Sequence, residues 1–340
     1  MDPLSDFIDK AGVCGAFFAR ARGQAPWAVA TRGAAGAIFH VALEGSGIVR
    51  LADAGFAEAA NELTWQRGDV IVLPHGHSHV MASAAGVPAV AIRSLTAEVG
   101  ADGLPCVDCG VKANEGSRAG GERASILCGT FGLEPEAAEH LLPHLPPVLI
   151  TRGEGSSLAT WIDATLKLLS DERTLGQPGS RTVLQRLADV LFIHVLRVWI
   201  AKRQEVAPGW LRGLADPGVA RALEAIHDDP GAEWTAAGLA RVAGMSRSGF
   251  YSRFVAVVGE TPGDYLAKWR MLLARRRLRA GDDAIASVAA QVGYASEAAF
   301  SRAFKRRVGT SPAAWRAAQR SGALSPGRSD RPLSAALFEG

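Results

Sequence analysis

The stretch SRSGFYSRFVAVVGETPGDY, residues 246–265, returns fifty positions later as SEAAFSRAFKRRVGTSPAAW, residues 296–315. Both copies begin with serine and carry phenylalanine at the fifth and ninth positions. Both then have glycine at the fourteenth position, proline at the seventeenth and an aromatic residue at the twentieth. Matches at this fixed spacing predict one structural unit that the chain uses twice.

A short amphipathic segment precedes each copy, over residues 235–243 and 284–292. Thr235 and Asp283 are suitable N-cap residues for these two predicted helices. A glycine follows each segment and suits a sharp turn into the next helix. Each copy, together with the segment before it, therefore predicts a helix, a turn and a second helix.

A helix, a glycine turn and a second helix form the helix-turn-helix motif. The sequence predicts two such units in tandem, at residues 234–256 and 284–307. Residues 262–279 can form one long helix between them. A rigid connector of this kind would fix the orientation of one unit relative to the other.

The two phenylalanines of each copy lie four residues apart, so they share one face of a helix and can bury it. The opposite face is then free to enter the major groove of DNA, which is wide enough for one helix. Arg302 and Lys305 suit guanine and phosphate groups. The predicted DNA-binding residues are Arg247, Ser248, Tyr251, Ser252, Arg253, Ser296, Glu297, Ala298, Ser301, Arg302 and Lys305. The alternative is a plain helical repeat with a basic, solvated face.

Charge is concentrated in the same part of the chain. The whole sequence has 37 Lys and Arg against 34 Asp and Glu, for a net charge of +3. Residues 234–320 hold fifteen of these bases and five of the acids, so the remainder is net acidic. A basic module on an acidic remainder indicates a polyanionic partner for the module alone, which here would be double-stranded promoter DNA.

Residues 239–246, 292–305 and 309–312 are similar to the signature of the AraC/XylS transcription regulators. The resemblance covers about residues 217–320. It implies a reader of two successive major grooves, usually an activator that contacts RNA polymerase. Gly249 departs mildly from the pattern, because glycine inside a helix costs about 1 kcal/mol relative to alanine.

The N-terminal half has the composition of short strands separated by turns, which predicts a small sandwich or barrel. Residues 68–79, GDVIVLPHGHSH, resemble the second motif of the cupins, and His40 with Glu44 resembles a degraded first motif. The resemblance would place a further histidine at Ala42, so one metal ligand is absent. His40, Glu44 and His79 nevertheless form a candidate site for zinc or another divalent metal. The alternative is a hydrogen-bonded core histidine beside a surface turn.

Cys106 and Cys109 form a C-x-x-C pair within a segment, residues 97–124, that we expect to be a loop. Such pairs bind zinc or cycle through a disulfide. Cys128 could complete either a metal site or a redox site with them. Two unremarkable thiols are the remaining alternative.

The fold class predicted is α+β with several domains. Residues 1–130 would form the cupin-like sensor domain and 131–206 a helical connector. Residues 210–320 would form the all-α DNA-binding domain and 321–340 a disordered tail. Within the connector, an apolar stripe over residues 181–202 predicts either packing inside the subunit or a homodimer interface.

The leading interpretation is a one-component transcription regulator that responds to a small-molecule effector or an oxidant and is not an enzyme. A metal-dependent cupin enzyme with an appended DNA-binding module is the alternative. No secretory signal is evident, because acidic residues stand where a basic flank would be needed. No apolar stretch is long enough to cross a bilayer. We therefore expect no membrane partner and a cytoplasmic location.

Overall fold

The computed structural model describes residues 3–11, 13–34, 36–52, 62–100, 104–109, 121–153, 179–201 and 208–321. They divide into two compact units. The helical unit comprises residues 1–12, 134–145 and 200–328, and the barrel unit comprises residues 13–133, 146–199 and 329–340.

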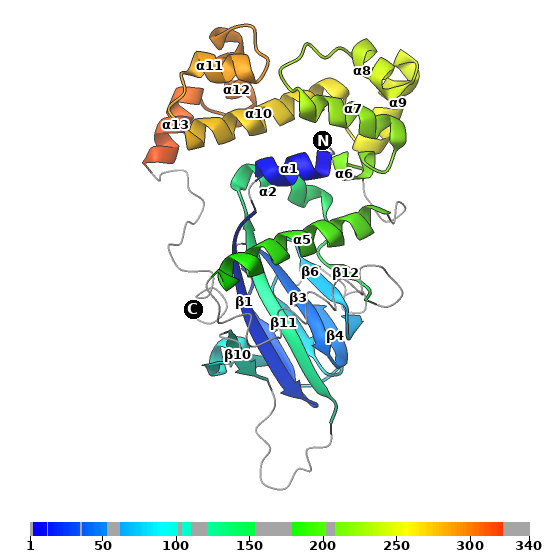
Figure 1. The fold of residues 1–340 in the computed structure, drawn as a ribbon, viewed down its shortest axis with the longest axis vertical. Coiled ribbons are helices and arrows are strands. Elements are labelled where there is room, and N and C mark those ends of the chain that lie inside the picture. The colour runs from blue at the N-terminus through cyan, green and yellow to red at the C-terminus, as the bar shows by residue number, and fades with distance from the viewer. Residues whose placement is uncertain are drawn as a thin grey trace. The chain divides into compact units, whose positions relative to one another are not determined.

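The barrel unit contains a seven-stranded sheet in the order β12-β6-β3-β11-β1-β10-β9 and a five-stranded sheet in the order β5-β4-β7-β2-β8 (Figure 1). The strands of the larger sheet are β1 (Val13–Gln24), β3 (Ala37–Glu44), β6 (Val70–Leu73), β9 (Ala97–Val99), β10 (Pro105–Asp108), β11 (Arg123–Leu133) and β12 (Leu149–Thr151). Those of the smaller sheet are β2 (Ala28–Thr31), β4 (Ser46–Leu51), β5 (Glu62–Gln66), β7 (His79–Ala82) and β8 (Val90–Ala91), and η2 (Ile92–Ser94) follows β8.

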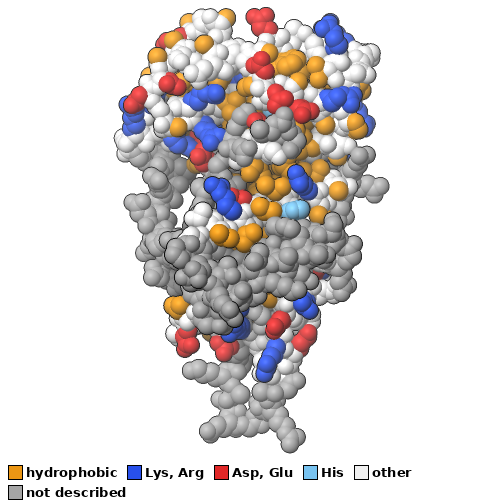
Figure 2. Space-filling model, in the orientation of Figure 1, with side chains coloured by type: hydrophobic (Ala, Val, Ile, Leu, Met, Phe, Trp, Pro, Cys, Tyr) orange, Lys and Arg blue, Asp and Glu red, His pale blue; other side chains and the backbone are white. Residues whose placement is uncertain are grey.

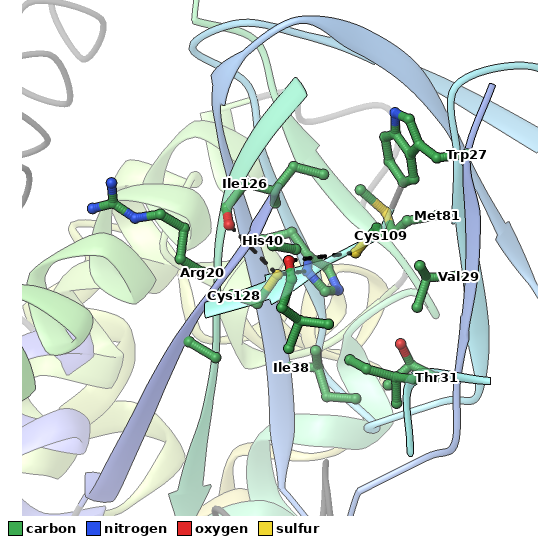
Figure 3. A pocket seen from close by; sticks show the side chains of 14 residues that line it. Arg20, Trp27, Val29, Thr31, Ile38, His40, Met81, Cys109, Ile126 and Cys128 are labelled. Atoms are coloured by element: carbon green, nitrogen blue, oxygen red, sulfur yellow. Dashed lines mark hydrogen bonds between the residues drawn. The ribbon is translucent and has the colours of Figure 1, made fainter. Parts of the chain in front are cut away.

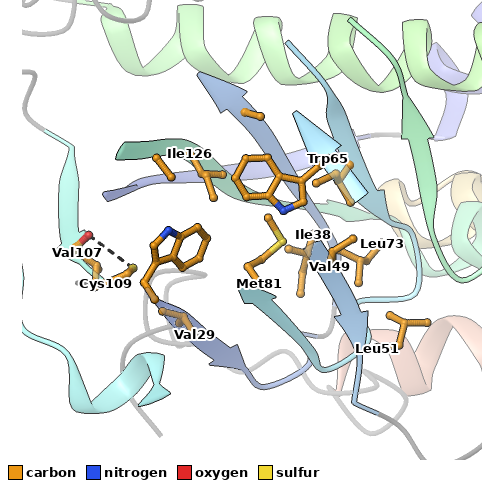
Figure 4. Close-up of a cluster of buried hydrophobic side chains, with 14 residues drawn as sticks. Val29, Ile38, Val49, Leu51, Trp65, Leu73, Met81, Val107, Cys109 and Ile126 are labelled. Atoms are coloured by element: carbon orange, nitrogen blue, oxygen red, sulfur yellow. Dashed lines mark hydrogen bonds between the residues drawn. The ribbon is translucent and has the colours of Figure 1, made fainter. Parts of the chain in front are cut away.

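Apolar side chains from both sheets form one core (Figure 4). Trp27 and Trp65 are buried in it with their ring centroids 6.2 Å apart, and Met81 and Ile38 pack in the same cluster. Helix α5 (Ser180–Ala201) lies across the larger sheet (Figure 1). Burial of this kind stabilises the fold by about 25 cal/mol for each Å² of apolar surface removed from water.

The predicted apolar stripe falls on α5, where Leu191 and Val195 are buried and Val183 is half exposed. Packing within the subunit therefore accounts for part of the stripe. A homodimer interface on this helix stays a prediction.

The expected loop over residues 97–124 contains two strands that composition did not predict. β10 pairs in parallel with β1, with Cys106 opposite Arg20, and β9 pairs with β10. The tertiary partner β1 supplies hydrogen bonds that the glycine-rich, polar sequence alone does not suggest. The strand β11 was also missed, and its pairing with β1 runs from Val13 opposite Leu133 to Gln24 opposite Arg123.

The helical unit is built from short helices around one long one, α10 (Figure 1). The helices are α1 (Pro3–Ala11), α2 (Pro135–Leu141), η3 (Leu142–His144), α6 (Trp210–Gly213), α7 (Pro217–Asp228), α8 (Ala236–Ala243), α9 (Arg247–Val258), α10 (Pro262–Ala280), α11 (Ile285–Gln291), α12 (Glu297–Val308) and α13 (Pro312–Arg320). The long connector predicted over residues 262–279 is confirmed as α10.

The compact units do not follow the predicted domain boundaries, because α1 and α2 lie in the helical unit. The predicted tail at 321–340 lies outside the described residues except for Ser321, and so does a helix expected at 158–169. No helix among the described residues is long and apolar enough to cross a membrane.

Candidate nucleic-acid interface and barrel pocket

The first predicted helix-turn-helix consists of α8 and α9. Thr235 is the N-cap of α8, and its Oγ1 accepts a hydrogen bond from Gly238 N at 3.0 Å. The helix ends at Gly244, whose φ of +69° lies in the left-handed region that glycine adopts without strain. Ser246 then caps α9. The predicted turn chemistry is confirmed in this unit.

The second unit repeats the arrangement with α11 and α12. Gly293 has a φ of +81°, and Ser296 caps α12 by accepting from Ala299 N at 3.2 Å. The N-cap predicted for the first helix of this unit was wrong. Ala284, not Asp283, holds the N-cap position of α11 and makes no side-chain cap. Asp283 lies one residue too early for its carboxylate to do so.

The buried faces of the two units match in geometry. Phe250 and Phe254 are fully buried, with ring centroids 5.5 Å apart and planes at 59°. Phe300 and Phe304 are also fully buried, and the same distance and angle relate their rings. The aromatic residue that closes each repeat completes the cluster, since Tyr265 meets Phe254 at 6.1 Å and Trp315 meets Phe304 at 6.3 Å.

The opposite faces of α9 and α12 are open to solvent. Tyr251 is 46% exposed, although large aromatic side chains are usually buried. Among the eleven predicted DNA-binding residues, ten are exposed and Ser301 is partly buried. The structure therefore places the predicted set on two exposed helix faces, each backed by a phenylalanine pair.

Gly249 lies in the first turn of α9, where its backbone N donates to Ser246 Oγ at 3.2 Å. A Cβ at this position would come within 2.9 Å of that oxygen. The matching Ala299 is accommodated because its cap, Ser296, has a φ of −155° whereas Ser246 has −63°. A side chain at residue 249 would therefore require the Ser246 hydroxyl to shift.

Many of the basic residues in this module are held by acidic neighbours. Arg253 Nε lies 2.7 Å from Asp216 Oδ2, and Asp216 in turn caps α7 by accepting from Gly218 N and Val219 N. Seven of the fifteen bases counted in residues 234–320 form ion pairs in the structure: Arg253, Lys268, Arg275, Arg276, Arg279, Arg307 and Arg320. Figure 2 accordingly shows blue basic groups beside red acidic groups on the helical unit. Arg302 and Lys305 are exposed on α12 outside these pairs.

The barrel unit contains a cavity of about 40 Å³ between its two sheets, room for about three water molecules. Apolar residues dominate its lining, among them Trp27, Val29, Ile38 and Met81 (Figure 3). Strands β1 and β11 contribute Ala19, Ala21, Ile126 and Cys128 to its wall. Arg20 extends its guanidinium group away from the other labelled side chains (Figure 3).

A hydrogen-bonded chain of three side chains runs beside this cavity. His79 Nδ1 donates to the carbonyl oxygen of His77 at 3.0 Å, which leaves its Nε2 as an acceptor. His40 Nε2 donates to it at 2.8 Å, and His40 Nδ1 accepts from the Cys128 thiol at 3.0 Å. Each imidazole is thereby held as one neutral tautomer.

Burial controls the charge of these groups. It lowers the pKa of His79 to about 4 and, with help from His79, holds the pKa of His40 well below its usual value. Burial also raises the pKa of the Cys109 thiol to about 12 and that of Cys128 further. The imidazoles and these two thiols are therefore uncharged at neutral pH, and Arg20 is the charged residue of the cavity lining.

The metal-ligand set predicted from the sequence is not assembled. Glu44 is exposed at the end of β3, four residues and thus about 13 Å along the strand from His40. The two imidazoles bond directly to each other, and the second nitrogen of His40 is engaged by Cys128. No group of three His, Cys, Asp or Glu within the described ranges could hold a metal ion. These residues do not fit the zinc or other divalent ion that the cupin resemblance implies.

The cysteine pair is also separated by the fold. Residues three apart on an extended strand face opposite sides, so Cys109 lines the cavity with Cys128 and Cys106 does not. All three are free thiols. The thiolate is the reactive form of cysteine, and burial keeps Cys109 and Cys128 protonated. A redox role for Cys106, Cys109 and Cys128 stays a prediction. In the structure, the protonated thiols of Cys109 and Cys128 form an uncharged part of the cavity lining.

Two comparisons identify what the units resemble. Residues 2–201 match the cupin family, and residues 239–318 match a helix-turn-helix domain. An AraC-like transcription regulator of Streptomyces lividans is 40% identical over 229 residues, which cover 66% of this chain and 75% of the relative. The transcriptional regulator AlkR of Acinetobacter baylyi is 29% identical over 317 residues, covering 93% of this chain and 99% of the relative.

Among solved structures, the DNA-binding domain of the transcriptional factor AdpA in complex with a target DNA is 34% identical. The match covers 33% of this chain and 99% of that domain, with a TM-score of 0.31.

Proposed function

This chain belongs to the AraC-like transcription regulators with an N-terminal cupin domain, and on that premise we propose that it is a one-component regulator controlled by a small, uncharged effector. Its helix-turn-helix domain binds DNA. The observation that carries the assignment of reading faces is the repeated geometry of α9 and α12. In both helices a buried phenylalanine pair leaves a polar face exposed.

The two reading faces differ in chemistry. α12 presents Arg302 and Lys305, which can pair with guanine and phosphate. α9 presents Ser248 and Tyr251, while its Arg253 is tied to Asp216. We assign the stronger base discrimination to α12.

Replacing Arg302 with alanine should weaken binding to a cognate operator by at least about fivefold, because one bidentate arginine–guanine contact is worth about 1–3 kcal/mol. The operator is first selected from a random duplex library with the wild-type protein. Fluorescence anisotropy at one fixed salt concentration then gives Kd for both proteins, since phosphate contacts make Kd depend on salt.

The matched control is Arg93→Ala, which removes an equally exposed arginine from the barrel unit. It should leave the operator Kd within twofold of wild type. An Arg302→Ala protein that binds as tightly as the control would remove Arg302 from the reading face.

The nature of the effector follows from the cavity. Its wall is mainly apolar, its thiols are protonated and its imidazoles are neutral, and the guanidinium of Arg20 extends away from the other labelled side chains (Figure 3), so burying a charged ligand among them would be costly. A volume of about 40 Å³ admits only a very small molecule unless the strands move apart. We therefore propose a small neutral, mainly apolar effector whose binding widens the barrel.

A homologous pair of probes tests this proposal. At about ten times its Kd, 1-hexanol should stabilise the protein by about 1.4 kcal/mol, which raises Tm by a few degrees. Hexanoate at the same concentration should raise Tm less, because burying its carboxylate is costly. Differential scanning calorimetry measures both.

Filling the cavity provides the control. Ala19 lines it, whereas Ala30 lies on β2 outside its lining. Ala19→Leu should abolish the shift caused by 1-hexanol, and Ala30→Leu should preserve it. Equal shifts with the alcohol and the carboxylate, or an unchanged shift in Ala19→Leu, would contradict binding in this cavity.

We propose two further partners, RNA polymerase and a second copy of this chain. RNA polymerase would be contacted by the DNA-bound regulator, and the exposed part of α5 near Val183 would support self-association as a homodimer. The relatives are transcription regulators, which supports a non-enzymatic role for the cupin domain and action on DNA in the cytoplasm.

A further inference from the structure

Two short helices from the N-terminal half of the chain are part of the helical unit. α1 and α2 belong to the same compact unit as α6 to α13. Both lie outside residues 239–318, which match the helix-turn-helix domain. The DNA-binding module therefore packs with two helices that come from the N-terminal half of the sequence.

α1 packs against the rest of the helical unit through an aromatic cluster. Phe7 is 1% exposed, and its ring centroid lies 5.0 Å from that of Trp210 and 6.4 Å from that of Trp269 on α10. His140 of α2 stacks on Trp210 at 5.4 Å and faces Phe7 at 5.8 Å. Trp210 Nε1 also donates to the carbonyl oxygen of His140 at 3.2 Å. The cluster joins α1, α2, α6 and α10.

Buried polar contacts connect α1 to Tyr265 of α10, and Tyr265 in turn packs against α9. Asp6 Oδ2 lies 3.3 Å from His227 Nδ1, and both side chains are buried. His227 Nε2 is 2.7 Å from Tyr265 Oη, and Tyr265 packs edge-on against Phe254 of α9. Burial and nearby carboxylates raise the pKa of Tyr265, so its hydroxyl stays protonated and donates to His227.

α2 is held to the other end of α10 by ion pairs. Glu136, which is 3% exposed, accepts two hydrogen bonds from Arg279, one of them from Nη1 at 2.6 Å. Glu139 Oε1 accepts from Arg275 Nη2 at 3.0 Å. The two guanidinium groups lie 5.6 and 5.8 Å from the ring of Trp315, which closes the core of the second unit. α2 thus contacts α10 where the second reading unit begins.

The same two helices continue directly into the barrel strands that line the cavity. α1 ends at Ala11 and β1 begins at Val13, while β11 ends at Leu133 and α2 begins at Pro135. Val13 and Leu133 are paired, so both junctions lie at one end of the β1–β11 ribbon. Further along this ribbon are the cavity residues of β1 and β11.

We infer that α1 and α2 are the regulatory link of this protein: they convert a displacement of β1 and β11 at the cavity into a displacement of α10, which carries the two reading units. The inference rests on the proposed function, since it needs an effector that widens the barrel. Because a single residue separates each helix from its strand, the helix must move when the strand moves. Because α1 contacts α10 at Trp269 and α2 contacts it from Tyr265 to Arg279, their movement displaces or bends the helix that joins α9 to α12.

The test combines a change at the cavity with a variant in which the ion pairs between α2 and α10 are removed. Ala19→Leu, or 1-hexanol added to the wild type, alters the cavity. Glu136→Gln/Glu139→Gln removes both charges that hold α2 to α10 while keeping side-chain size. Glu62→Gln/Glu98→Gln is the matched control, because both residues are exposed on the barrel unit. Full-length proteins are used throughout, and operator Kd is measured by anisotropy.

Each cavity change should alter operator Kd at least fivefold in the wild type and in the control pair. In Glu136→Gln/Glu139→Gln the change should fall below twofold, and hydrogen exchange in residues 135–141 should quicken. An equal change in all three backgrounds would overturn the inference, and so would unaltered exchange in α2 or a wild-type Kd that ignores both cavity changes. Failure of the proposed effector class is read separately, from 1-hexanol giving no calorimetric shift, and Ala19→Leu then still tests the link.

Discussion

Phe304→Ala is expected to unfold the second helix-turn-helix unit and to abolish operator binding at 37 °C. Phe304 is fully buried, packs against Phe300 at 5.5 Å and meets Trp315 at 6.3 Å. Removing a buried phenylalanine ring costs about 3–5 kcal/mol, from lost burial and from the cavity left behind. Domains have only about 5–15 kcal/mol in total, so this loss is a large part of their stability.

Chemical denaturation followed by circular dichroism measures the loss, and anisotropy measures operator binding. The adjacent Lys305 provides the control, because it is exposed on the same helix. Lys305→Ala should weaken operator binding while the free energy of unfolding changes by less than about 0.5 kcal/mol. If Phe304→Ala and Lys305→Ala are equally stable, α12 is not anchored in the way described.

The second large effect concerns acid. The pKa of His79 is about 4 in the folded protein, against about 6.5 in an unfolded chain. A lowered folded pKa means that the unfolded state binds the proton more readily, so stability is complete above pH 6.5 and falls as pH drops toward 4. For His79 alone, moving from pH 7.5 to pH 5 should cost about 2 kcal/mol. His40, whose pKa is lowered by burial and by His79, adds to this in the same direction.

His79→Gln should flatten this dependence for the barrel unit, because glutamine does not titrate, although it lowers stability at neutral pH. His77→Gln, two residues earlier and partly exposed, should keep the wild-type slope. Urea unfolding curves at pH 7.5, 6 and 5 for the three proteins give the comparison. A His79→Gln protein with the same slope as the wild type would show that this imidazole is not the titrating group.

The tandem units were predictable because their signal is local. The caps Thr235 and Ser296, the positive-φ glycines and the phenylalanine pairs act within one turn or one helix. Spacing alone therefore indicated which faces are buried. The exception is Asp283, which was predicted to cap α11, whereas Ala284 occupies the N-cap position.

The features that sequence reasoning missed depend on distant partners. β1 and β11 carry no strong periodic pattern, and α1 is a single short amphipathic segment; all three are stabilised by pairing and packing across more than a hundred residues. The arginines of α10 were counted among the basic residues of the DNA-binding module, but Arg279 and Arg275 face the acidic residues of α2. One signal was available: Glu134, Glu136 and Glu139 are spaced to place their carboxylates along one short helix.

The candidate metal site illustrates the limit of motif spacing. His40 and His79 were correctly expected to be close, and they are 2.8 Å apart. Glu44 was not excluded by its spacing, and only the register of β3 shows that it lies at the far, exposed end of the strand. The partner of the pair is instead Cys128, from a strand whose existence the sequence did not reveal.

α10 acts as a ruler of fixed length and fixed phase. Its 19 residues span about 28 Å, slightly less than one turn of B-DNA at about 34 Å. Adding a single residue to it would turn the second unit by about 100° around the helix axis, so its length cannot be adjusted in small steps. Selectivity among promoters then depends on the spacing between the two contacted grooves.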